Sequence, residues 1–134
     1  MDFIINHWAV LVCAILNLVL GAIWYSPMLF YNGWKRANHF TDEQLKSVKP
    51  AVTYTLAFIF SLIISYNMAF FLGDAQTDWQ WGATAGFLAG FGFSSLIFAI
   101  IALFEMRSWA YILINGGFIT VYFTLVGLIL GAWR

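Results

Sequence analysis

No charged residue interrupts WQWGATAGFLAGFGFSSLIFAIIALF, residues 79–104 of this chain. A helix rises about 1.5 Å per residue, and roughly 20 apolar residues cross the hydrocarbon core of a bilayer. The stretch is too long for a strand of a membrane barrel and lacks the alternation that such a strand shows. Because backbone groups in lipid must bond within their own segment, the stretch is predicted to be one transmembrane helix.

Three other uncharged stretches accompany it, residues 3–34, 50–73 and 108–133. Of the 134 residues, 63% are hydrophobic and only 9% are charged, whereas soluble domains carry about 25% charged residues. The mean hydropathy is +0.84. The predicted fold class is therefore all-α, a polytopic membrane protein. Its single domain, residues 1–134, has four spans near residues 3–25, 50–73, 79–104 and 109–132.

Composition also excludes several functions. The net charge is zero and no long basic or acidic run occurs, so no nucleic-acid partner is expected. Cys13 is the single cysteine, and with His7 and His39 it forms no set of metal ligands. No Ser-His-Asp pattern and no glycine-rich phosphate loop with its lysine occurs. We therefore expect neither a metal nor another cofactor, and no enzymatic activity.

Helix starts are visible at the predicted span boundaries. Thr41–Gln44 and Thr77–Gln80 both fit a capping box, in which the fourth side chain bonds back to the first residue's backbone N–H. Pro50 suits the first turn of span two, and Ser108 can cap span four. These signals support the proposed boundaries.

The distribution of basic residues predicts the orientation. The first loop, residues 26–49, holds Lys35, Arg36, Lys46 and Lys49, and the third loop holds Arg107. The second loop, residues 74–78, has no basic residue. Cytoplasmic loops carry an excess of Lys and Arg, so loops one and three are expected in the cytoplasm and both termini outside.

The first uncharged stretch is too long for one crossing, because residues 3–34 would extend about 48 Å as a helix. Pro27 disfavours helical backbone at Ser26, and Ser-Pro is a favourable start for a new helix. We expect span one to end near Tyr25 and a short interfacial helix to begin at Pro27. The alternative is one long helix that Pro27 kinks.

The same segment carries a sequence motif. Its residues are Gly21, Trp24, Tyr25, Ser26, Pro27, Leu29, Phe30 and Trp34, and a second similar segment is FEMRSWAYILINGGF (104–118). Together they resemble DUF1761, a family of bacterial four-helix membrane proteins of unknown function, over nearly the whole chain. The resemblance implies a four-helix fold in a bacterial inner membrane. It implies no active site.

Polar residues inside spans usually face protein or a water-filled cavity. The chain has five candidates for lining a pore or joining helices, namely Asn17, Ser61, Ser65, Asn115 and Thr120. We expect the two asparagines to make hydrogen bonds between helices, worth about 0.6 kcal/mol each on average in membranes.

Small residues form faces on every span, and such faces let helices approach closely. The glycines expected to pack helices are Gly82, Gly86 and Gly90 in span three and Gly127 and Gly131 in span four. The groove in span three could accept span two of the same chain. Because one bundle centre cannot easily absorb four small faces, we expect at least one of them to contact another copy, in a homo-oligomer held partly by span three.

Glu105 ends span three, close in sequence to Arg107. The expected arrangement is an interfacial ion pair between these two side chains. The alternative is a carboxylate that handles protons or cations, although coupling groups of transporters usually lie near the midplane.

Two functions follow from these observations. The first is a homo-oligomeric channel- or transporter-like protein for a small solute. The alternative is a structural or accessory membrane protein that packs with a partner or with lipids and transports nothing. Apart from the lipid bilayer and other copies, the sequence names no partner and no solute.

Overall fold

The computed structural model describes residues 3–134, and every regular element in that range is a helix. Four helical segments are long and apolar enough to cross a membrane: α1 (His7–Trp24), α4 (Pro50–Phe71), Trp79–Phe104, and α7 (Trp109–Ala132). The third segment consists of α5 (Trp79–Phe87), the π-helix η1 (Leu88–Ser95) and α6 (Leu96–Phe104). The prediction of an all-α protein with four spans is confirmed.

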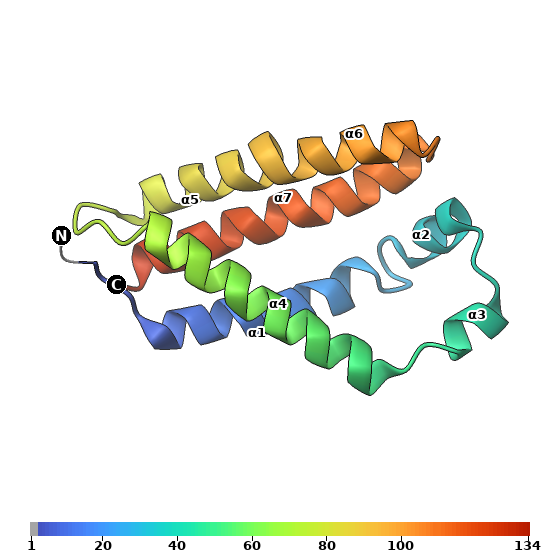
Figure 1. Cartoon of the computed structure of the whole chain (residues 1–134), viewed down its shortest axis with the longest axis horizontal. Helices are drawn as coiled ribbons and strands as arrows, with labels where there is room; N and C mark the ends of the chain where they lie inside the picture. The colour runs from blue at the N-terminus through green and yellow to red at the C-terminus, as the bar shows by residue number, and fades with distance from the viewer. Residues whose placement is uncertain (1–2) are drawn as a thin grey trace.

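Helices α1, α4 and α7 contact one another, and the third span lies outside them against α7 (Figure 1). Helix α1 packs against α4 on one side and against α7 on the other. The third span, seen as one continuous rod in Figure 1, packs almost entirely on α7. Helix α7 is therefore the element that joins the third span to the rest of the chain.

The two ends of the bundle, along the direction of the helices, differ in their loops. The C-terminus and the α4–α5 loop lie at one end, and the two short helices α2 (Tyr31–Asn38) and α3 (Asp42–Lys46) lie at the other, near the α6–α7 turn (Figure 1). The Arg134 guanidinium closes the first end, because it donates to the carbonyl oxygens of Leu72 and Asp74, each at 2.6 Å. The arrangement places both predicted basic loops at the same end of the bundle.

Helix α1 begins at His7, so the prediction that span one is helical from residue 3 is wrong. The Asn6 side chain accepts from the backbone N–H groups of Trp8 and Ala9, at 3.0 and 3.2 Å. The chain before it bonds elsewhere, since the Ile4 amide donates to the Gly73 carbonyl at 2.9 Å. An asparagine cap thus starts the helix one turn later than the apolar composition indicates.

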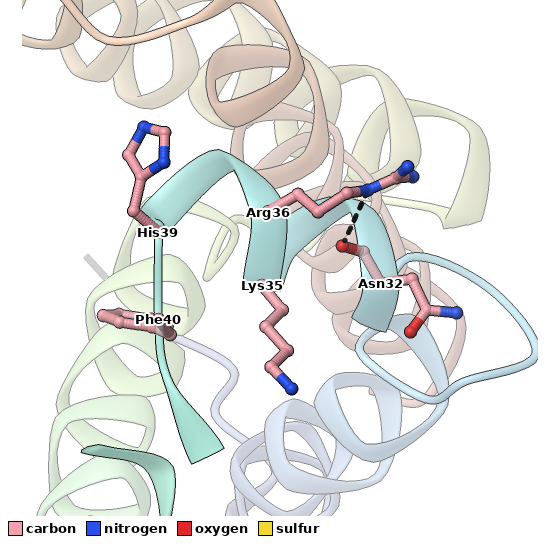
Figure 2. Close-up of a pocket in the computed structure, with 5 residues that line it drawn as sticks. All are labelled: Asn32, Lys35, Arg36, His39 and Phe40. Atoms are coloured by element: carbon pink, nitrogen blue, oxygen red, sulfur yellow. Dashed lines mark hydrogen bonds between the residues drawn. The ribbon is translucent and has the colours of Figure 1, made fainter. Parts of the chain in front are cut away.

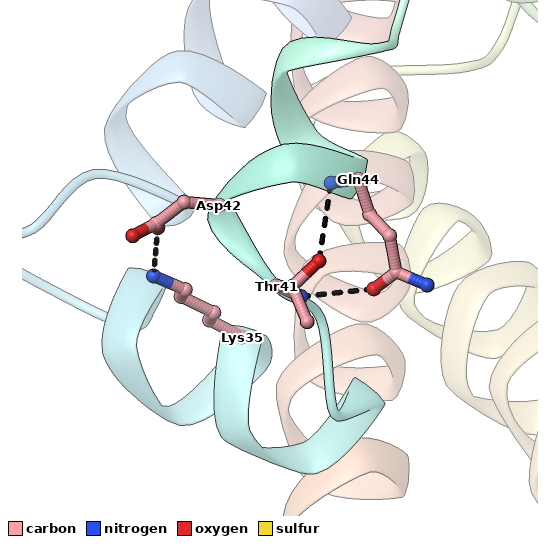
Figure 3. Close-up of polar contacts among 4 residues, drawn as sticks. All are labelled: Lys35, Thr41, Asp42 and Gln44. Atoms are coloured by element: carbon pink, nitrogen blue, oxygen red, sulfur yellow. Dashed lines mark hydrogen bonds and ion pairs between the residues drawn. The ribbon is translucent and has the colours of Figure 1, made fainter.

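The other helix starts agree with the sequence except at one residue. The capping box at Thr41 and Gln44 is confirmed (Figure 3), and Pro50 and Ser108 occupy the predicted starts. The capping box at Thr77 is wrong, because Asp78 caps α5 by accepting from the Trp81 amide at 2.8 Å. Aspartate is a stronger N-cap than threonine, which explains the shift by one residue.

The break at Ser26-Pro27 is confirmed, and the single kinked helix is ruled out. Helix α1 ends at Trp24, and residues 25–30 form turns. The start of the next helix at Pro27 is wrong, because α2 begins at Tyr31. The Ser26 hydroxyl bonds back to the Ile23 carbonyl at 2.7 Å instead of capping a new helix. The Tyr31 amide then donates to the Ser26 carbonyl at 3.2 Å, which completes the turn.

The π-helix η1 was not foreseen from the sequence. It covers LAGFGFSS, in which hydrogen bonds span five residues instead of four. A Cβ placed on Gly92 would meet nothing within 4 Å, whereas one on Gly90 would press against Phe123 of α7. The glycine-rich segment therefore follows the surface of α7, and it brings Ser95 at its end against that helix.

Candidate functional site

A buried polar cluster lies where α1, α4 and α7 meet. Its centre is Tyr122, near the middle of α7, whose side chain is 2% exposed. The Tyr122 hydroxyl donates to the Cys13 carbonyl at 3.0 Å and lies 3.5 Å from the Ser65 hydroxyl. The side chains of Ser61 and Asn17 lie close to the same hydroxyl. Three of the five predicted polar residues are therefore brought together around a tyrosine.

The two serines of this cluster already have partners inside their own helix. Ser61 donates to the Ala57 carbonyl and Ser65 to the Ser61 carbonyl, each at 2.7 Å. Both side chains are buried within one chain. Because each hydroxyl donates its hydrogen bond to the preceding turn of its own helix, neither serine has a hydroxyl donor free to face a pore.

Tyr122 was missed in the sequence analysis, although a signal for it was present. Tyrosines of membrane proteins concentrate at the two interfaces, where the hydroxyl reaches water. A tyrosine near the centre of a span needs a partner inside the protein. Its position opposite Asn17 and the serines could not be read from one helix alone, because the pairing of α1, α4 and α7 decides it.

Asn115 lies elsewhere, at the junction of α1 and α7. Its side-chain oxygen accepts from the Tyr25 hydroxyl at 2.6 Å, and its amide donates to the Tyr111 carbonyl at 3.0 Å. Beside it, the Trp24 indole N–H donates to the Ile114 carbonyl at 2.9 Å. The Trp-Tyr pair of the motif thus fastens the end of α1 to α7.

The rest of the motif packs around this junction. The ring of Phe30 lies 4.8 Å from that of Trp24, and the ring of Trp34 lies 5.8 Å from that of Tyr25. The turn at Ser26-Pro27 reverses the chain so that these aromatic rings meet. In the WYSP motif, two aromatic residues anchor the end of α1 to α7. The turn that follows brings Phe30 and Trp34 back to pack against them.

Thr120 belongs to a third group, between α7 and η1. Its hydroxyl lies 2.9 Å from the Ser95 hydroxyl, and both hydroxyls bond to the Gly116 carbonyl, at 2.9 and 2.8 Å. Ser95 was not among the predicted residues. The five predicted polar residues thus lie in three separate groups, and they do not line one path.

The glycines of the third span pack inside the chain. A Cβ on Gly82 would fall on the carbonyl oxygen of Gly127, and one on Gly86 on that of Phe123. Gly131 approaches the Asp78 carbonyl in the same way. The expectation that this face contacts another copy is wrong, and so is the alternative partner, span two. Span four fills the groove because Gly82 meets Gly127 and Gly131, and because the backbone of Phe123 can lie directly against Gly86.

The ion pair expected between Glu105 and Arg107 does not form. Arg107 donates instead to the Asn38 side-chain oxygen, and its guanidinium lies 3.8 Å from the centre of the Tyr111 ring. Met106 adopts a left-handed backbone with φ of 59° between the two residues. This reversal directs Arg107 toward α2 and α7, while Glu105 is exposed.

The ion pair seen among residues 3–134 joins Lys35 to Asp42 and links α2 to the start of α3 (Figure 3). The hydrogen bond to Asp42 raises the pKa of Lys35 above its ordinary value, so the lysine stays protonated. Asp42 thereby neutralises one of the basic side chains of the first loop.

Comparison with known families matches residues 8–131 to the family described as "Protein of unknown function (DUF1761)". The match covers nearly the whole of the four-helix unit, including the aromatic junction. No curated protein and no solved structure matches the chain significantly.

Proposed function

The chain belongs to the DUF1761 family, and from that premise we propose that it is a structural or accessory membrane protein that packs with a partner and transports nothing. The observation that carries the proposal is the bonding of the mid-span hydroxyls. Ser61, Ser65 and Thr120 all bond to carbonyls of their own helices, and the two serines are buried in the chain. A water-filled path needs polar groups that are free to replace the hydration of a solute.

We propose that the first partner is another copy of the chain. The beginning of α4, residues 50–56, is exposed all round, whereas one face of the second half of the helix is buried against α1 and Tyr122. Thr53 and Thr55 lie in the exposed part, where a neighbouring helix could accept hydrogen bonds from their hydroxyls. Closed rotational symmetry is the usual outcome of such self-association.

A channel or transporter for a small solute is the second candidate. The observation that favours it is Asn17, a half-buried amide near the middle of α1 beside the Tyr122 hydroxyl. Polar groups at this depth are costly in lipid and often mark a solute pathway.

One preparation tests both candidates. In mild detergent, native mass spectrometry is expected to find a multiple of the 15.2 kDa chain, and proteoliposomes are expected to take up glycerol, urea and small ions no faster than empty vesicles. A saturable uptake that Asn17→Leu abolishes, while the exposed Thr84→Val leaves it intact, would contradict the accessory role and favour the transporter. A monomer that keeps its lipid in several detergents would contradict self-association.

We further propose the bacterial inner membrane as the location, with the α2–α3 end in the cytoplasm. Five basic residues lie at that end, namely Lys35, Arg36, Lys46, Lys49 and Arg107, against Arg134 at the other. Such a bias in short loops directs insertion.

Labelling of introduced cysteines tests this orientation. With Cys13 replaced by alanine, a membrane-impermeant maleimide added to intact cells is expected to label Gln76→Cys and to spare Lys46→Cys. Both positions are exposed in the structure, so access to the side chain does not bias the comparison. Labelling of position 46 from outside would reverse the assigned orientation.

A further inference from the structure

Two hollows lie along the first half of α7. One, of about 280 Å³, separates α2 from the start of α7 and is lined by Gly33, Arg36, Ala37, His39, Ser108 and Ala110. The other, of about 380 Å³, lies between α7 and the η1–α6 segment. Its lining is apolar apart from the hydroxyls of Ser95 and Thr120. The first hollow is therefore basic, and the second is suited to hydrocarbon.

One strip of α7 connects the two hollows. Ala110 lines the first, and Leu113, Gly117 and Val121 line the second. Steps of three, four and four residues keep these positions on one face of a helix. From Ala110 to Val121 the strip extends about 16 Å, about half of the ~30 Å hydrocarbon core, which is the depth of one leaflet.

The basic end of this strip carries the Arg36 guanidinium, which has no acidic partner among residues 3–134. Figure 2 shows Lys35 and His39 pointing in opposite directions from α2, and Lys35 is paired with Asp42. Arg36 makes one long hydrogen bond, 3.4 Å from its Nε to the Asn32 carbonyl. Arg36 and His39 line both the first hollow and a more open one of about 840 Å³, and both side chains are exposed (Figure 2).

We infer that this strip binds one anionic phospholipid, with its phosphate on Arg36 and His39 and one acyl chain along Leu113, Gly117 and Val121. A guanidinium donates to phosphate oxygens through two parallel N–H bonds, which an ammonium cannot do. Basic hollows between helices suit anionic lipid headgroups. The apolar hollow one leaflet deep favours a lipid over a free anion. The inference is independent of the proposed packing function.

Native mass spectrometry of the full chain tests the site, with phosphatidylglycerol and phosphatidylcholine of identical acyl chains offered in equal amounts. Wild type is expected to retain phosphatidylglycerol preferentially, and Arg36→Gln is expected to lower that preference about tenfold, because both lipids carry a phosphate but only phosphatidylcholine carries an ammonium group that the guanidinium repels. Lys46→Gln, which removes a basic residue from the same loop but outside the hollow, is the matched control and is expected to keep the preference.

A second variant tests the acyl-chain part. Leu113 is 67% exposed, so Leu113→Trp can fill the apolar hollow without disturbing the core, and it is expected to lower retention of both lipids. Equal losses for Lys46→Gln and Arg36→Gln would overturn the inference, because they would show attraction to the loop as a whole. Displacement of phosphatidylglycerol by inorganic phosphate, with Leu113→Trp having no effect, would also overturn it, because that result describes a free-anion site.

Discussion

Gly127→Ala is expected to separate the third span from α7 and to leave little folded protein. A Cβ on Gly127 would fall on the carbonyl oxygen of Gly82, and the neighbouring backbone of Gly86 also lies within contact distance. Backbone atoms inside two packed helices cannot move aside as a flexible side chain can. Overpacking of a core typically costs about 1–3 kcal/mol, and a contact of backbone with backbone belongs at or above the upper end of that range.

The chain offers a matched control for this substitution. Gly92 lies in η1, and a Cβ there would meet nothing within 4 Å. Gly92→Ala is therefore expected to be neutral or to stabilise by up to about 1 kcal/mol, because alanine is the better helix former. Thermal unfolding in mild detergent compares the two variants. Equal stability of Gly127→Ala and wild type would contradict the close contact of α5 with α7.

Tyr122→Ala is also expected to give a large loss, about 3–5 kcal/mol, because it empties a fully buried aromatic site between α1, α4 and α7. Tyr122→Phe removes only the hydroxyl that donates to the Cys13 carbonyl. Its expected cost is smaller, about 0.6 kcal/mol and at most ~1.7 kcal/mol for such bonds in membranes.

Denaturant titration in mixed micelles measures both variants of Tyr122. Tyr54 is 61% exposed on α4, so Tyr54→Phe controls for the loss of a tyrosine hydroxyl and is expected to leave the unfolding midpoint unchanged. If Tyr122→Ala unfolded at the same midpoint as wild type, the three-helix junction described above would be incorrect.

The spans and most of their boundaries could be predicted because lipid imposes them. An uncharged run of the right length must be helical in a bilayer, and helix-start residues such as the cap Ser108 and the first-turn proline Pro50 are local signals that need no knowledge of the fold. The errors at His7 and Asp78 also have a local origin. At both places a polar side chain one to three residues away was the better cap.

The pairing of the helices could not be predicted in the same way. All four spans have a face of small residues, and the sequence of one such face does not determine which other face it packs against. The glycines of span three and of span four fit each other because neither has a side chain at the contact. That complementarity emerges only when the helices are placed together, which is why Gly82 was expected to face another copy.

The polar residues inside the spans could be predicted one by one, but the sequence did not show which of them lie together in the fold. Asn17, Ser61 and Ser65 were chosen because polar side chains in lipid need partners. Their common partner Tyr122 was missed, because an aromatic residue in an apolar span does not stand out by composition. The predicted pair of Glu105 and Arg107 failed since Met106 reverses the backbone between them, and a positive φ at a methionine has no sequence signal.

Solid-state NMR in bilayers shows whether the glycine faces of the third and fourth spans pack within one chain. Chains with ¹³C-labelled glycine are diluted into a large excess of unlabelled chains, and the cross-peak between Gly82 and Gly127 is followed. The structure predicts that this cross-peak keeps its intensity per labelled chain at every dilution, because both glycines belong to the same molecule. Loss of the cross-peak on dilution would assign the contact to two different copies and would contradict packing of the third and fourth spans within one chain.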